Sequence, residues 1–147
     1  MAPEQLFSIA NLIALAAWVA LVILPHRRRV ADVVAGLAVP LVFAAAYLLI
    51  VAVTFGRSPG GFGSLADVGT LFDDRWLLLA GWIHYLAFDL LVGTWEVRDA
   101  RERGLPHLLV VPCLVLTFLF GPAGWLLYRG LALTKSSQMR QSRSPFA

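Results

Sequence analysis

The charged residues of this chain are confined to the stretches between four long apolar blocks. Of the 147 residues, 59% are hydrophobic and only 14% are charged, whereas a soluble domain carries about 25% charged residues. Each block is long enough to cross a hydrocarbon core of about 30 Å, which takes roughly 20 helical residues. Strands of a membrane barrel would span about 10 residues and would alternate in polarity. The sequence therefore predicts an all-α integral membrane protein.

The four blocks predict a four-transmembrane-helix bundle that fills a single membrane domain over residues 1–134. The expected helices cover about 6–24, 33–55, 76–95 and 108–128. Pro40 should bend the second helix, and the Gly121-Pro122 pair should break or kink the fourth. Residues 135–147 are polar and basic, and we expect them to form a disordered tail.

The basic residues predict how the bundle is oriented in the membrane. Three arginines follow the first helix and three follow the third, whereas the N-terminus has none. The positive-inside rule then places the N-terminus outside, and four crossings place both termini there. The basic residues from Arg129 onward oppose this orientation. The chain starts directly at its first helix, without the charged region of a signal peptide or a plant transit peptide, so we expect a bacterial inner-membrane protein.

Composition also limits the partners and cofactors. The net charge of +3 comes from residues beside the apolar blocks, so membrane lipids rather than nucleic acids are the expected partners. The single cysteine, Cys113, excludes an intramolecular disulfide and a cysteine-based metal cluster. Two histidines at the same depth in the membrane could bind haem. His26 and His107 are both expected at the inner end of the bundle, whereas His84 lies much deeper in the third helix, so the depths do not match. We expect neither a metal nor another cofactor.

The third helix carries the polar residues that are least expected inside a bilayer. Asp89 lies near the predicted membrane midplane, where an ionisable group is costly and a functional role is the first hypothesis. The alternative is a neutral hydrogen bond that holds helices together. Tyr85 and Trp82 share a face with Asp89, and His84 lies about 100° to the side of Tyr85. We expect this polar and aromatic face to point into the bundle.

Two polar residues of the first helix, Asn11 and Ser8, are the expected partners across the bundle. They could hold helices together or contact a substrate directly. Glu96 follows Asp89 on the same stripe, but it is also the first of a group of charges that includes Asp99 and Glu102. We interpret that group as a solvated ion-pair network at the membrane surface.

Several runs together resemble one small family of membrane proteins. They are Phe7-Ser8-Ile9-Ala10-Asn11, Gly81-Trp82-Ile83-His84-Tyr85-Leu86-Ala87-Phe88-Asp89-Leu90 and Phe120-Gly121-Pro122-Ala123-Gly124. The chain is similar to the abscisic-acid-deficient-four-like proteins, whose best-known member is a plant plastid protein required for neoxanthin synthesis. Neoxanthin forms when an epoxide ring of violaxanthin opens to an allenic alcohol without net redox change. The resemblance implies a carotenoid-like or other isoprenoid lipid as substrate or ligand.

Two main hypotheses follow for function. The first is an acid/base isomerase in which His84 and Asp89 handle protons and Tyr85 donates a hydrogen bond. Asn11, Ser8 and Trp82 would then bind the substrate. The alternative is a non-catalytic protein that binds a lipid or pigment or assembles a complex. The sequence neither supports nor excludes a homo-oligomer. A small transporter is a third hypothesis, which only Asp89 and the kinked helices support.

Overall fold

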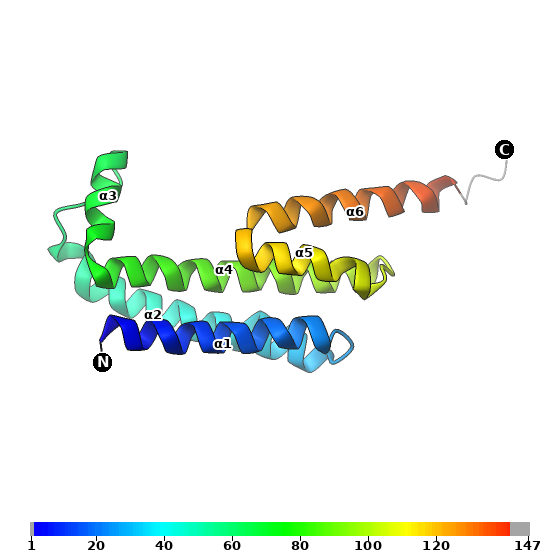
Figure 1. Ribbon diagram of the computed structural model, residues 1–147, viewed down its shortest axis with the longest axis horizontal. Helices are drawn as coiled ribbons and strands as arrows, with labels where there is room; N and C mark the ends of the chain where they lie inside the picture. The colour runs from blue at the N-terminus through cyan, green and yellow to red at the C-terminus, as the bar shows by residue number, and fades with distance from the viewer. Residues whose placement is uncertain (1, 142–147) are drawn as a thin grey trace.

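The computed structural model describes residues 2–141, with side chains described as far as Thr134, and this part of the chain is helical without any strand. Short connections join the helices (Figure 1). Their bounds are α1 Pro3–Ile23, the π-helix η1 Arg29–Ala38, α2 Val39–Thr54, the 3-10 helix η2 Phe55–Arg57, α3 Leu65–Asp73, α4 Arg75–Glu102, α5 His107–Phe120 and α6 Pro122–Gln141. The predicted all-α class is confirmed.

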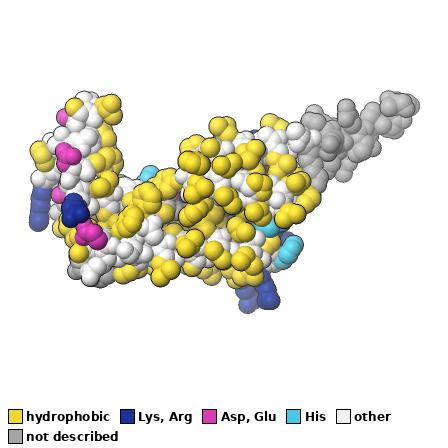
Figure 2. All heavy atoms as spheres, viewed as in Figure 1, with side chains coloured by type: hydrophobic (Ala, Val, Ile, Leu, Met, Phe, Trp, Pro, Cys, Tyr) yellow, Lys and Arg dark blue, Asp and Glu magenta, His cyan; other side chains and the backbone are white. Residues whose placement is uncertain are grey.

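Three segments of the described chain are long and apolar enough to cross a membrane. They are α1, the continuous stretch Arg29–Arg57 and α4. They correspond to the first three predicted helices, although the second and third are longer than expected. All three lie side by side along the long axis of the molecule (Figure 1). Figure 2 shows hydrophobic side chains over most of the visible surface of this bundle, as contact with lipid tails requires.

The prediction of one fourth helix over 108–128 is wrong, because the chain reverses inside that block. Gly121 has a φ of 45° and ends α5, and Pro122 begins α6, which runs back along α5 (Figure 1). The predicted break at Gly121-Pro122 is therefore confirmed. With 14 residues, α5 is about 21 Å long, too short for a hydrocarbon core of about 30 Å. The structure thus has a helical hairpin, which we call the α5–α6 hairpin, in place of the fourth crossing.

The hairpin changes where the two ends of the chain lie. The imidazole of His107, at the start of α5, is 2.9 Å from the carbonyl oxygen of Val22 near the end of α1. The described end of α6 returns to this same end of the bundle, opposite the N-terminus (Figure 1). The expectation of both termini outside depended on a fourth crossing, which residues 2–141 do not form. Helix α6 also extends to Gln141, into the predicted tail, and residues 142–147 lie outside the described part.

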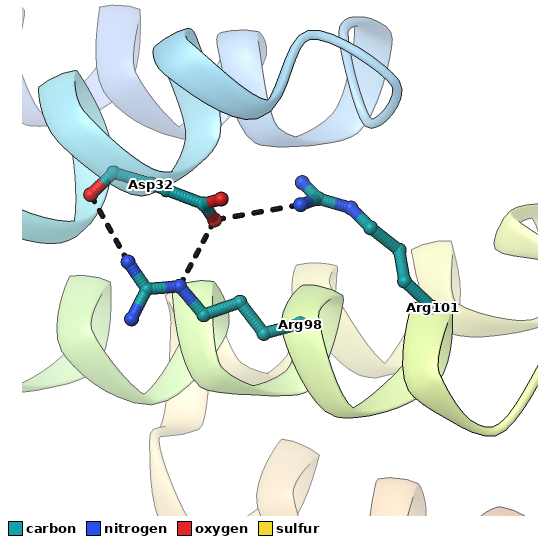
Figure 3. Close-up of polar contacts among 3 residues, drawn as sticks. All are labelled: Asp32, Arg98 and Arg101. Atoms are coloured by element: carbon teal, nitrogen blue, oxygen red, sulfur yellow. Dashed lines mark hydrogen bonds and ion pairs between the residues drawn. The ribbon is translucent and has the colours of Figure 1, made fainter.

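The second membrane helix begins as a wide π-helix rather than as a simply bent α-helix. The Val39 amide donates to the carbonyl oxygen of Val34, five residues earlier, and the following Pro40 has no amide hydrogen to continue an α-helical pattern. Asp32 ties this π-helix to α4, because its carboxylate accepts from Arg98 Nε at 2.9 Å and from Arg101 at 3.4 Å (Figure 3). These two ion pairs hold the beginning of η1 against α4.

Helix α4 is the centre of the molecule and packs against α1, η1, α2, α3, α5 and α6. Small residues let the neighbours approach closely, as is usual between membrane helices. At Gly93, a Cβ atom would lie 2.7 Å from Cζ3 of Trp18, so only glycine leaves room for this indole. Two apolar clusters result along α4, one toward each end. Asp89 lies between them, after Ala87 of one cluster and before Leu90 of the other.

Candidate functional site

The candidate site lies along one face of the first half and the middle of α4. Asp74 starts this helix, because its carboxylate accepts from the amides of Trp76 at 2.8 Å and Leu77 at 3.1 Å. From that fixed start, the helical period brings Trp82, Tyr85 and Asp89 to one face. The sequence predicted this shared face.

A cleft of about 640 Å³ lies between the beginning of α1, the helix α3 and the first half of α4. A hollow above α4, between α3 and the α5–α6 hairpin, is visible in Figure 2. The cleft is lined mainly by apolar and aromatic side chains, together with a few polar groups. Its lining residues include Phe7, Ser8, Phe72, Leu78, Trp82 and Tyr85. At one edge, Arg75 and Glu4 form an ion pair of 2.8 Å, with both side chains more than half exposed.

The indole of Trp82 is held in place across the bundle by Asn11. Trp82 Nε1 donates to Asn11 Oδ1 at 3.0 Å, and Asn11 Nδ2 donates to the Phe7 carbonyl oxygen at 2.9 Å. The Phe7 ring also packs against Trp82, with 5.6 Å between ring centroids. Ser8 lines the cleft, but its hydroxyl donates to the carbonyl oxygen of Glu4. Asn11 therefore positions the wall of the cleft rather than offering free hydrogen-bonding groups.

Tyr85 forms the boundary between the cleft and the interior of the bundle. Its ring packs against Trp82 at 5.4 Å, and its hydroxyl donates to the carbonyl oxygen of Phe118 on α5 at 3.3 Å. The same hydroxyl lies close enough to interact with the carboxyl group of Asp89, one turn further along α4. Tyr85 thus contacts the cleft on one side and a buried acid on the other.

Asp89 lies behind Tyr85, beneath the tip of the α5–α6 hairpin. Its side chain is buried, with 9% of the residue exposed. A Cβ atom at Gly121 would lie 2.9 Å from Asp89 Oδ1, so the glycine lets the hairpin tip close over the carboxyl group. Asp89 Oδ2 has no hydrogen-bond partner among the described residues. An acid in this position needs a proton or a bound partner, because an unpaired buried charge is very unfavourable.

His84 does not lie with Tyr85 and Asp89. It lines a second cavity, of about 380 Å³, on the side of α4 that faces α2. The imidazole packs between Tyr47 at 5.6 Å and Phe88 at 4.5 Å. The two cavities are separated by Phe72, which packs over Gly81 and lines both. The structure therefore brings Ser8, Trp82, Tyr85 and Asp89 together and leaves His84 at a different cavity.

The interpretation of Glu96 as part of a solvated surface network is wrong. Glu96 is fully buried under the α5–α6 hairpin, where its Oε1 accepts from Thr117 Oγ1 at 2.9 Å. The neighbouring charges do form ion pairs, since Arg103 binds Asp99 at 2.6 Å. The sequence did contain a signal that Glu96 points inward, because it lies on the same helical stripe as Trp82, Tyr85 and Asp89.

No described group of three or more His, Cys, Asp or Glu residues could hold a metal ion. The polar side chains of the two cavities and of the interior behind them include carboxyl, phenol, imidazole and hydroxyl groups. Such groups can donate, accept and transfer protons.

Long apolar helices around a cleft that is backed by a buried acid define a small helical membrane protein. The family model described as ABA DEFICIENT 4-like matches residues 5–128, which include every candidate site residue. The chain belongs to this family. No match was found among curated proteins or among solved structures.

Proposed function

We propose that this protein binds a carotenoid-like or other isoprenoid lipid in the 640 Å³ cleft and isomerises it, with Tyr85 and Asp89 handling the proton. The observation that carries the proposal is the position of the Tyr85 hydroxyl, between an apolar cleft and a buried carboxyl group. Membership of the ABA DEFICIENT 4-like family supports a neoxanthin-related reaction.

The cleft has the properties that a cyclic isoprenoid end group requires. Its walls include the flat rings of Phe7, Phe72 and Trp82, and its size is typical of pockets for small ligands. Asn11 keeps the Trp82 indole in one orientation, so the aromatic wall is formed before a ligand binds. A ring stacked on this wall would place an oxygen substituent near the Tyr85 hydroxyl.

The proposed reaction is the opening of an epoxide to an allenic alcohol. A neutral Asp89 passes its proton through the Tyr85 hydroxyl to the epoxide oxygen, so that one C–O bond breaks and one O–H bond forms. A neighbouring carbon then loses a proton, and the electron pair of its C–H bond forms the new C=C bond. Asp89 recovers that proton through Tyr85, and no electrons are gained or lost. His84 has no role in this scheme, because it lines the other cavity.

A non-catalytic binding protein is the second candidate. The separation of His84 from Asp89 favours it, because the predicted acid/base pair is not assembled around one cavity. The polar groups of Asn11 and Ser8 are also occupied by bonds within the protein. Such a protein would hold the lipid without changing it.

We also propose an orientation with the N-terminus and α3 outside and the end of α6 inside. All Lys and Arg residues other than Arg57 and Arg75 lie in the turn after α1, near the end of α4, or from Arg129 onward. Because α6 runs back along α5, its described end lies at the end of the bundle that holds the other two groups of basic residues (Figure 1). The arrangement agrees with the positive-inside rule and removes the conflict that a fourth crossing creates.

The test uses the purified protein in lipid nanodiscs with an epoxy carotenoid, and with a carotenoid that lacks the epoxide. Wild type should convert only the epoxide. Tyr85→Phe and Asp89→Asn should bind it normally but convert it at least about 10²-fold more slowly. Tyr47→Phe is the matched control, because it removes a phenol hydroxyl at the second cavity.

Three outcomes separate the hypotheses. Conversion at the wild-type rate by both Tyr85→Phe and Asp89→Asn would exclude the proposed chemistry. Binding by wild type without conversion of the epoxide would support the non-catalytic candidate. If neither carotenoid binds, and mass spectrometry of lipids extracted from the purified protein detects no isoprenoid, the ligand class is wrong.

A further inference from the structure

Glu96 is a second buried acid on α4, and the proposed reaction does not use it. It lies two helical turns after Asp89 and is completely shielded from solvent. Thr117 donates to Oε1, whereas Oε2 is buried without a hydrogen-bond partner among the described residues. Asp89 Oδ2 is in the same condition. Two carboxyl groups on one helix face therefore each present a free oxygen to the interior under the same hairpin.

The α5–α6 hairpin is shaped to hold Glu96 in this position. Gly124 has no side chain, and the backbone of α6 therefore contacts Thr117 directly. That contact fixes the threonine whose hydroxyl reaches Glu96. Gly121 forms the tip of the same hairpin and covers Asp89. One structural element thus encloses both acids.

The groups around Glu96 do not include a described cation that pairs with it. From α5 and α6, Cys113 and Tyr128 interact electrostatically with Glu96, and from α4 Asp89 does so. The arginines that next follow Glu96 in the chain have other carboxylate partners, since Arg98 and Arg101 pair with Asp32 and Arg103 pairs with Asp99. A charged carboxylate in such surroundings would be strongly unfavourable, so the neutral acid is the expected form of Glu96. It therefore holds a proton that it can donate.

We propose that Glu96 supplies Asp89 with the proton that it holds before each reaction, so that the two residues form a relay between the cleft and the basic end of the bundle. This inference rests on the proposed function, in which Asp89 must be protonated before it can act on the substrate. The two Cα atoms are separated by about 10 Å along the helix axis. Helical side chains lean toward the N-terminus, so Glu96 extends toward Asp89, while Asp89 itself leans toward Tyr85. Bridging water is needed to complete the path between the two carboxyl groups.

The transfer is balanced at both residues. The O–H bond of the Glu96 carboxyl group breaks, and its proton passes through water to the carboxylate of Asp89. Glu96 is left as a carboxylate, which the Thr117 hydroxyl stabilises by its existing hydrogen bond. A proton from the aqueous basic end then restores Glu96. In that direction lie Tyr128 and Asp99, whose side chains are joined by a hydrogen bond of 2.6 Å.

Infrared spectroscopy of the ligand-free protein tests the relay directly, through the carbonyl stretch of protonated carboxylic acids. Wild type should show two buried-acid bands, of which Glu96→Gln removes one and Asp89→Asn removes the other. After transfer into D₂O, the Asp89 band should exchange at least about 10²-fold more slowly in Glu96→Gln than in wild type. Glu102→Gln is the matched control, since it makes the same change at an exposed position of α4 and should alter neither band.

Two results would overturn the relay. One is a Glu96→Gln spectrum that keeps both bands, which would mean that Glu96 is charged. The other is loss of its band with unchanged exchange at Asp89. If Glu96→Gln does not fold, Thr117→Val serves instead, because loss of the hydroxyl should shift the Glu96 band alone, and an unshifted band would refute the assignment. No ligand is needed, so a failure of the carotenoid assay would not be mistaken for a failure of the relay.

Discussion

Replacing Gly121 with alanine should destabilise the α5–α6 hairpin through two separate effects. The residue has a φ of 45° and a ψ of −96°, and side-chain-bearing residues in sparsely populated regions of this kind cost about 1–3 kcal/mol. The new Cβ atom would also lie 2.9 Å from Asp89 Oδ1. Moving Asp89 off its rotamer adds about 0.5–1.5 kcal/mol. The expected loss of stability is therefore roughly 1.5–4.5 kcal/mol.

The assay is thermal unfolding of wild type and variant in one detergent. For a chain of this size, the expected loss corresponds to a decrease in Tm of roughly 5–15 °C. Gly130→Ala is the matched control on α6, because a Cβ atom at Gly130 meets nothing within 4 Å. Alanine is favoured over glycine inside a helix by about 1 kcal/mol, so this control should melt at the same temperature as wild type or higher.

A double-mutant cycle separates the two effects at the hairpin tip. In an Asp89→Ala background the carboxyl group is gone, so Gly121→Ala should cost only the backbone term. The difference between the two backgrounds should be about 0.5–1.5 kcal/mol. The reasoning is refuted if Gly121→Ala melts with wild type, or if its effect is the same in both backgrounds. Either result would mean that the hairpin tip does not press on Asp89.

Three further predictions follow from the packing and the orientation. In a variant whose native cysteine is replaced by alanine, Ser64→Cys should react with an impermeant thiol reagent in intact cells, and Ser142→Cys only after permeabilisation; labelling of both from outside would indicate a fourth crossing. Asn11→Ala should destabilise the protein by about 0.6 kcal/mol and alter Trp82 fluorescence, and unchanged emission would contradict the observed hydrogen bond. Gly93→Ala should cost about 1–3 kcal/mol through overpacking against the indole on α1, and an unchanged melting temperature would show that this indole can move away.

The sequence was most informative where hydrophobicity alone decides the structure. The first three membrane helices were predictable, because apolar blocks of such length leave a chain few alternatives in lipid. The fourth block is as apolar as the others, and its Gly121-Pro122 pair did predict a break. A kink and a complete reversal have the same local signal, however. The reversal depends on Gly121 closing over Asp89 and on α6 packing against Thr117, which are contacts between residues distant in sequence.

The site was partly predictable for a similar reason. Helical periodicity placed Trp82, Tyr85 and Asp89 on one face, and it placed His84 to the side, where the structure has it in another cavity. Asn11 was expected to form a hydrogen bond across the bundle, and it does so with Trp82. Glu96 was assigned to the surface because its neighbours in sequence are charged. Glu96 is buried by the α5–α6 hairpin. A spanning fourth helix was expected there, so there was no reason to expect that Glu96 would be covered.

The limited length of the α5–α6 hairpin has a consequence for how a ligand would reach Tyr85. The hairpin ends near the middle of α4, so no helix of the described chain continues beside the first half of α4 on that side (Figure 1). In a bilayer, this side faces the acyl chains rather than water. A very insoluble molecule would therefore enter by sideways diffusion within the membrane, without a soluble carrier and without exposing its hydrocarbon to water. Its concentration in the lipid phase, rather than in the surrounding solution, would then determine how fully the cleft is occupied.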